Sequence, residues 1–283
     1  MVGGIGFVAA ILALAGSLAV WSSTALAAPV SETVRHTSQA DFRDAELAGM
    51  VWKPGTTPKG WDAGLILGAG AGGYIPSGTI TSRPIVTAFP FNNVVVSWNV
   101  VAPDRTGAVI EVRARSEKGE WTAWYQIARW GKLTSPPGLA HKKDDAGYVN
   151  EDTLELKSKA TALQYRVTLL TEDSNATPIL RLIAACYADT NNQAAVPAFA
   201  PPAYPSQTPW VRDLPVPFRS QRSEDPSIAG RICSPTSVAM VMDYHGVGVP
   251  TAVVAAQAHD SLNDIYGNWP FNTAAAALYG FEA

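Results

Sequence analysis

Hydrophobic and polar residues alternate between residues 89 and 187, in short runs that turn-forming residues separate. Alternation over about four to eight residues is typical of a strand with one buried face. Many short strands with turns between them favour an all-β sandwich of jelly-roll type. The pattern predicts strands over residues 89–101, 109–115, 121–126, 154–156, 163–169 and 179–187.

The aromatic residues of this predicted sandwich have two interpretations. Aromatic side chains at alternating strand positions usually fill the core between two sheets, and we favour that interpretation. The alternative is an exposed platform that stacks on sugar rings, which would make the sandwich a binding module for carbohydrate or a cell surface. The residues concerned are Trp98, Trp121, Trp124, Tyr125 and Trp130.

After residue 212 the apolar positions follow a helical spacing. A helix is predicted over residues 233–245, where Val238, Val241 and Met242 lie on one face. Pro235 suits the first turn of this helix, because its missing N–H would have no partner there. Further helical segments are predicted at 249–258 and 272–278, with a loop of turn-forming residues at 264–270 between them.

A proline-rich stretch separates the predicted strands from the predicted helices. Seven prolines lie between residues 197 and 217, a density that blocks both helix and sheet hydrogen bonding and favours an extended spacer. We therefore predict a signal peptide at 1–27, an N-terminal extension at 28–60, a β-sandwich at 61–190, a linker at 191–212 and a helical domain at 213–283.

The first residues predict export. Residues 6–20 are almost wholly apolar and lead to Ala25-Leu26-Ala27, a small-residue site typical of signal-peptide cleavage. An uncleaved membrane anchor is the alternative, although the apolar run falls short of the ~20 residues that span a bilayer. The protein is therefore expected to be secreted or held at the cell surface.

Composition excludes several function classes. The chain has 283 residues, of which 47% are hydrophobic and 16% charged, and a net charge of −3, so it is globular and long enough for two domains. Without a basic stripe, nucleic acid is not an expected partner. Cysteines, histidines and acids nowhere have metal-ligand spacing, and no nucleotide cofactor is implied.

Cys233 is the main candidate for chemistry. It stands at the start of the predicted helix at 233–245, where free backbone N–H groups and the helix dipole favour the thiolate over the thiol. Such a cysteine is a candidate nucleophile. Two alternatives remain: a disulfide with Cys186, the only other cysteine, and an unreactive packing role.

Three stretches carry a resemblance to a known family: residues 214–221, 233–244 and 266–270. Together they resemble the secreted bacterial relatives of the papain-like, bacteriocin-processing (double-glycine leader) cysteine peptidases. The segments at 77–82, 97–99 and 121–124 resemble accessory sandwich modules of secreted bacterial hydrolases. The resemblance implies an α+β papain-like domain whose helical half begins at residue 213. It also implies that Cys233 is the nucleophile and that Gln221 donates its side-chain amide to the oxyanion.

The general base has no clear candidate. Papain-like chemistry requires a histidine that an Asp or Asn orients. His36 and His141 lie far from Cys233 in the sequence, and His245 lies twelve residues along the same helix, roughly 18 Å away. His259, after the second helical segment, fits a helix-end role better. The chain is therefore expected to be an N-terminal fragment that lacks its catalytic His and Asp or Asn and is inactive.

Three functions from different classes follow, in order of preference. The first is a secreted cysteine peptidase acting on a peptide or protein substrate. The second is a surface- or carbohydrate-binding protein with an inactive peptidase-like domain. The third is a cell-wall amidase or acyltransferase that uses the same Cys-His chemistry on another acyl donor.

Overall fold

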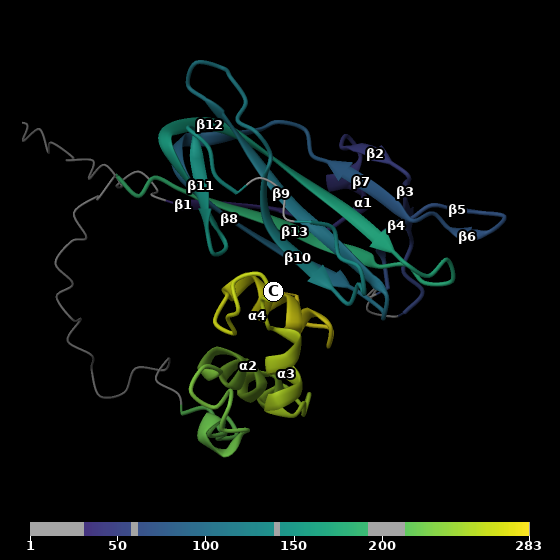
Figure 1. Ribbon diagram of the computed structural model, residues 1–283, viewed down its shortest axis with the longest axis vertical. Helices are drawn as coiled ribbons and strands as arrows, with labels where there is room; N and C mark the ends of the chain where they lie inside the picture. The colour runs from purple at the N-terminus through teal and green to yellow at the C-terminus, as the bar shows by residue number, and fades with distance from the viewer. Residues whose placement is uncertain (1–30, 58–61, 139–141, 192–212, 283) are drawn as a thin grey trace, which may run out of the picture.

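The computed structural model describes residues 31–57, 62–138, 142–191 and 213–282. They form a β-sandwich with a group of helices at one end (Figure 1). This confirms the predicted fold class, an all-β sandwich followed by a helical region. The predicted signal peptide and His141 lie outside the described residues, as does the predicted linker apart from its first residue. The predicted domain boundaries therefore stay a prediction.

Strand β12 joins the two layers of the sandwich. Its first residues pair with β11 and β8, and its later residues pair with β9 and β7, all antiparallel. Register shifts between Glu155 and Ala162 mark the point where the strand passes from one layer to the other. The strands are β1 Ser31–His36, β2 Glu46–Ala48, β3 Met50–Lys53, β4 Gly64–Leu67, β5 Ala69–Gly70, β6 Gly73–Tyr74, β7 Ser77–Thr81, β8 Ile85–Val101, β9 Thr106–Ser116, β10 Tyr125–Gly131, β11 Gly147–Asn150, β12 Thr153–Thr171 and β13 Ile179–Ala188.

The core lies between the layers and is largely apolar. Alternate residues of β8, from Val94 to Val100, are buried and meet residues of β9, β10 and β12 in one cluster. Trp98, Tyr125 and Trp130 are buried, as the favoured interpretation predicted. Trp121 and Trp124 are partly exposed instead, because they precede β10 and stack against arginine side chains of β9 and β12.

Residues 31–53 belong to the same sheet. Strand β1 pairs with β13, β2 with β7, and β3 with β4. The short helix α1 (Gln39–Phe42) connects β1 to β2 and buries Phe42 in the core.

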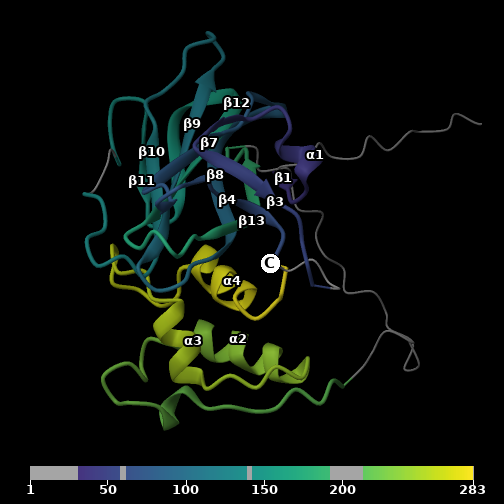
Figure 2. The ribbon, with the colours of Figure 1, turned by 90° about the vertical axis from the view of Figure 1, so that its right-hand side faces the viewer.

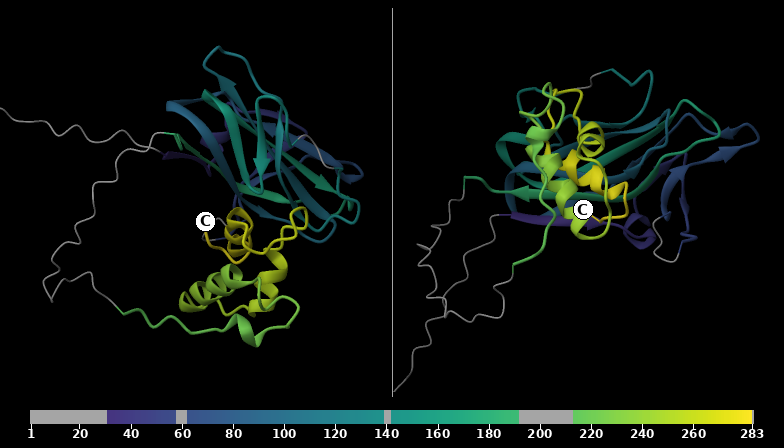
Figure 3. Two further views of the ribbon diagram at one scale, coloured as in Figure 1. Left: turned by 60° about the vertical axis from the view of Figure 1, so that its left-hand side comes forward. Right: turned by 90° about the horizontal axis from the view of Figure 1, so that it is seen from below.

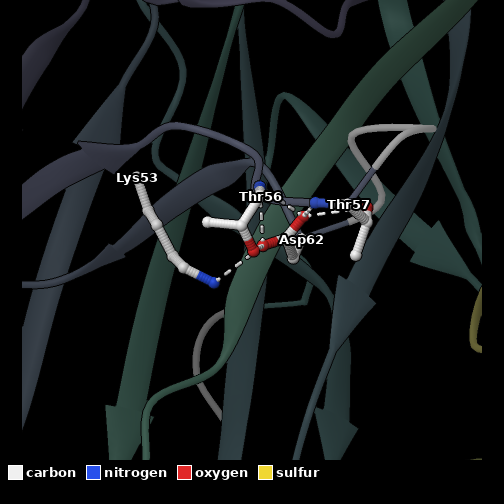
Figure 4. Close-up of polar contacts among 4 residues, drawn as sticks. All are labelled: Lys53, Thr56, Thr57 and Asp62. Atoms are coloured by element: carbon white, nitrogen blue, oxygen red, sulfur yellow. Dashed lines mark hydrogen bonds and ion pairs between the residues drawn. The ribbon is translucent and has the colours of Figure 1, made fainter.

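Asp62 holds Thr56 and Thr57, which follow β3, in place (Figure 4). Its carboxylate accepts hydrogen bonds from the backbone N–H and hydroxyl groups of Thr56 and Thr57 and pairs with Lys53. These hydrogen bonds, led by the Thr56 hydroxyl, hold the pKa of Asp62 far below its ordinary value. The carboxylate is therefore charged at all ordinary pH values and holds Thr56 and Thr57 close to Lys53 of β3.

The described residues 213–282 contain three α-helices: α2 (Cys233–Tyr244), α3 (Thr251–Gln257) and α4 (Trp269–Ala277). Helix α2 has the predicted start, and His245 caps its end. Helix α4 begins three residues earlier than predicted, because Pro270 fits its first turn and Asn272 bonds back to the Asn268 carbonyl. No described helix has the length and apolar character to span a membrane.

Helix α4 docks the helices onto the end of the sandwich, where β8 and β10 lie (Figures 2 and 3). Phe271 of α4 packs edge-on against Trp98 of β8 and Trp130 of β10, at centroid distances of 5.2 and 5.9 Å. The Trp130 indole donates to the Val100 carbonyl at 2.8 Å, which fixes its ring. Phe271, Ala274 and Ala275 thus share the core of the sandwich.

The half-buried His36 predicts a pH effect on stability. Its Nδ1 lies 2.5 Å from the hydroxyl of buried Tyr165, and burial lowers the pKa of His36 against a smaller opposing effect of Asp41. As pH falls below ~6.5 the unfolded chain takes up this proton before the native one does, so stability is lost. Urea unfolding at about pH 7.5 and about pH 5.5 should show a smaller loss for His36→Gln than for the wild type.

His245→Gln is the matched control, because His245 is exposed at the end of α2. That variant should keep the wild-type pH dependence. An unchanged pH dependence in His36→Gln would contradict the role given to His36.

Candidate active site

Cys233 is the first residue of α2, and its side chain is exposed. No side chain caps the N-terminus of this helix, and Pro235 has no N–H. The hydroxyls of Thr236 and Ser237 instead donate to carbonyls one turn back, at Ile232 and Cys233, and so reinforce the first turn. The backbone N–H groups at the start of α2 are therefore available beside an accessible sulfur, which is the arrangement an oxyanion needs.

Gln221 lies in the segment that leads to Cys233. It begins the short 3-10 helix η1 (Gln221–Ser223), and its Nε2 donates to the carbonyl of Ala229 at 2.7 Å. A glutamine amide has two N–H donors, so one remains after this bond is formed. The bond fixes the amide within the loop that ends at Cys233. The Gln221 amide forms no hydrogen bond with Cys233 itself, and its role as an oxyanion donor stays a prediction.

Arg219 anchors the start of this segment. Its guanidinium donates to the Val249 carbonyl and forms an ion pair with Asp243 of α2 at 2.7 Å. The chain between Arg219 and Cys233 is thus held to the helices at both of its ends, which positions Gln221 relative to α2.

A charged cluster lies on the loop between α3 and α4. Asp264 pairs with His259 at 3.0 Å and with Arg231 at 2.9 Å, and the rings of His259 and Tyr266 stack at 4.5 Å. The hydrogen bond with His259, followed by the hydrogen bond and the charge of Arg231, lowers the pKa of Asp264. Asp264 also has a positive φ of 52°, which is unusual outside glycine. The cluster ties the residue two places before Cys233 to this loop.

The described histidines do not form a pair with Cys233. His259 bonds to Asp264, His245 caps the far end of α2, and His36 bonds to Tyr165 in the sandwich. Among the described residues, neither a histidine nor another group is hydrogen-bonded to the Cys233 sulfur. The candidate nucleophile and the candidate oxyanion donor therefore lie on one segment, and no described histidine lies in hydrogen-bond contact with Cys233.

Both cysteines are free thiols. Cys186 is half-buried in β13 of the sandwich, whereas Cys233 is exposed on α2. The alternative of a disulfide between them is not realised in this structure. No group of three or more His, Cys, Asp or Glu side chains in the described ranges could hold a metal ion.

An apolar groove of about 410 Å³ runs between α2 and α4. Trp269, whose side chain is 76% exposed, lies at this groove, although the sequence placed it in a loop. The sequence did carry a signal that Trp269 begins a helix, because this residue directly precedes Pro270, and proline is common in a first helical turn. The groove is lined by Ser234, Ser237, Val238, Val241, Met242, Trp269, Asn272, Thr273, Ala276, Phe281 and Glu282.

The sandwich and the cysteine-bearing helices define a protein related to papain-like cysteine peptidases. Residues 32–188 match the family described as the Peptidase C39 N-terminal domain, and residues 213–283 match the Peptidase_C39 like family. Because the first match spans more than half of the chain, the chain belongs to the Peptidase C39 N-terminal domain family. A search of curated proteins gave no match.

Solved structures similar to the sandwich have low sequence identity. The C-terminal CBM6 of the laminarinase LamC from Zobellia galactanivorans is 11% identical, with a TM-score of 0.29; the match covers 54% of this chain and 98% of that one. The structure of infectious bursal disease virus, Gx strain, is 10% identical, with a TM-score of 0.27, over 57% and 34%. Likeness at this level carries no argument about ligands.

Proposed function

We propose that the chain forms part of an exported cysteine peptidase in which Cys233 is the nucleophile. The observation that carries the proposal is the exposed Cys233 sulfur at the uncapped N-terminus of α2. The match of residues 213–283 to the Peptidase_C39 like family supports it. The apolar segment at 6–20 and the Ala25-Leu26-Ala27 site support export.

The proposed reaction is acyl transfer to sulfur. The Cys233 thiolate attacks the peptide carbonyl carbon, and the oxyanion accepts hydrogen bonds from the Cys233 N–H and the free Gln221 N–H. A histidine, protonated when it takes the thiol proton, then gives that proton to the leaving amine. Water attacks the thioester, passes a proton back through the histidine and restores the thiol while the acid product leaves.

The test uses the protein as its own cells produce it. Cys233→Ala should abolish hydrolysis of a fluorogenic peptide library, and Gln221→Ala should reduce kcat by about 10²–10³, as loss of an oxyanion donor does. Cys186→Ala, the matched control, should leave hydrolysis unchanged because Cys186 lies in the sandwich. Full activity in Cys233→Ala would overturn the proposal.

The isolated chain of 283 residues permits a second prediction. Iodoacetamide should modify Cys233 before Cys186, because only Cys233 is exposed, and mass spectrometry of tryptic peptides measures the order. The same chain should show no peptide turnover, because no described histidine contacts the sulfur. Turnover that disappears in Cys233→Ala would show that a histidine of this chain reaches the site.

A second candidate is a binding protein whose peptidase-like domain is inactive. The absence of a Cys-His pair among the described residues favours it. A protein substrate is the expected partner in the first case and a carbohydrate or surface ligand in the second. The partly exposed Trp121 and Trp124 are the described aromatic residues left for such a ligand, yet arginine side chains already stack on them.

A further inference from the structure

A cavity of about 500 Å³ lies between the sandwich and the helices, apart from Cys233. Its size falls in the range of small-ligand sites, ~300–1,000 Å³, which often lie at domain interfaces. Residues of β10, α3, α4 and the adjoining loops line it, among them Arg129, Trp130, Val253, Gln257, His259 and Phe271.

The charges that line this cavity are all of one sign. Arg129 and Lys132 line it, together with the His259 ring, and no described Asp or Glu does. One Arg129 nitrogen donates to the Pro137 carbonyl at 2.7 Å, which leaves further N–H donors on the guanidinium. Lys132 pairs with the exposed Asp104, and His259 with the exposed Asp264, neither of which lines the cavity. Arg129 is thus the cation with the most free capacity for an anion.

Gln257 of α3 supplies an unpaired polar group at the same cavity. Its Nε2 bonds to the Tyr279 hydroxyl at 2.8 Å, whereas its buried Oε1 has no hydrogen-bond partner among the described residues. The hydroxyl can donate or accept, so either orientation of the amide leaves one polar atom unpaired. A peptide group satisfies both cases, because it carries an N–H and a C=O.

The remaining walls are apolar. Trp130 and Phe271 are buried rings of the core, and Val253 and Ala256 of α3 also line the cavity. Such walls bind an aliphatic or aromatic side chain through the area that it removes from water. The ligand that fits all three features has an anionic end, an adjacent peptide group and an apolar side chain.

We propose that this cavity binds the C-terminal end of a peptide whose last residue is apolar. The terminal carboxylate pairs with Arg129, the peptide group bonds to the Gln257 amide, and the last side chain packs against Trp130 and Phe271. The carboxylate and the peptide group together distinguish this ligand from a fatty acid, which has no group for Gln257. The site is independent of the chemistry proposed at Cys233.

The test is a titration of the 283-residue chain with N-acetyl-Ala-Leu, with its C-terminal amide and with decanoate, followed by ¹H–¹⁵N shifts. The free acid should bind with shifts at α3 and at the Trp130 indole. The amide should bind at least about tenfold more weakly, the effect of losing one charge-assisted hydrogen bond. Arg129→Met should lose the same factor, and Gln257→Leu should also weaken the acid.

Two matched controls separate the site from general effects. Arg83→Met removes an exposed arginine of the sandwich and should leave binding unchanged. Val253→Trp fills the cavity and should abolish binding. Val241→Trp is the matched control, because Val241 of α2 is also exposed but does not line this cavity, so binding should be unchanged. Three results would each overturn the proposal. The acid and the amide could bind equally; decanoate could bind more tightly than the acid, with an affinity that Gln257→Leu does not change; or the acid could fail to saturate.

Discussion

Replacing Phe271 with alanine lowers the free energy of unfolding by about 3–5 kcal/mol, the usual cost of truncating a buried phenylalanine. The ring is 3% exposed and fills the space between Trp98 and Trp130. Its loss removes apolar burial and leaves a cavity between the two buried indoles, of which Trp130 is held by its bond to the Val100 carbonyl. Urea unfolding followed by tryptophan fluorescence measures the change.

Trp269→Ala provides the control on the same helix. That side chain is 76% exposed, so its truncation should change the free energy of unfolding by about 0.5 kcal/mol or less. Limited proteolysis of Phe271→Ala should also cut between α2 and α4 earlier than in the wild type. A loss below about 1 kcal/mol would show that the sandwich does not depend on α4.

Glu111→Ala is expected to have the second largest effect. Glu111 is buried in β9, and its two carboxylate oxygens accept hydrogen bonds from Nε and Nη2 of Arg166, at 2.7 and 2.8 Å. Removing one partner of a buried pair costs ~3–5 kcal/mol, and because Arg166 is partly exposed we expect about 2–3 kcal/mol. The variant also leaves Arg113 and Arg166, which both stack on Trp124, without the carboxylate of Glu111.

The double variant Glu111→Leu with Arg166→Leu separates burial of a charge from loss of an attraction. It should be more stable than Glu111→Ala, because no unpaired charge is left in the sheet. Asp104→Ala breaks the exposed pair with Lys132 and should change stability by about 1 kcal/mol or less. Equal losses in Glu111→Ala and Asp104→Ala would contradict the importance given to the buried pair.

Sequence patterns predicted the strands with clear alternation and missed those without it. The segment at 89–101 became β8 with four more residues at its start. The segments at 154–156 and 163–169 belong to one strand, β12. The sequence pattern predicts two strands, because the polar residues at 157–159 interrupt the alternation where the strand changes layers. Strand β1 is mostly exposed, so its pairing with β13 rather than its own pattern makes it a strand.

At the candidate site, the sequence predicted the local structure around Cys233, but it did not predict contacts that depend on the folded chain. Pro235 and the apolar face of α2 placed Cys233 correctly at a helix start. Nothing in the sequence could show that Gln221 bonds to Ala229, because that contact depends on the folded loop. The docking of Phe271 against Trp98 joins residues 173 positions apart, and only the tertiary structure brings them together.

The long strand β12 has a consequence for how the protein comes apart. Since β12 pairs with β11 and β8 through its first residues and with β9 and β7 through its later ones, removing this one strand breaks hydrogen bonds in both layers. A mechanical pull that extracts β12 would therefore disrupt both layers together. The β12 amides should therefore be among the last in the chain to exchange with deuterium.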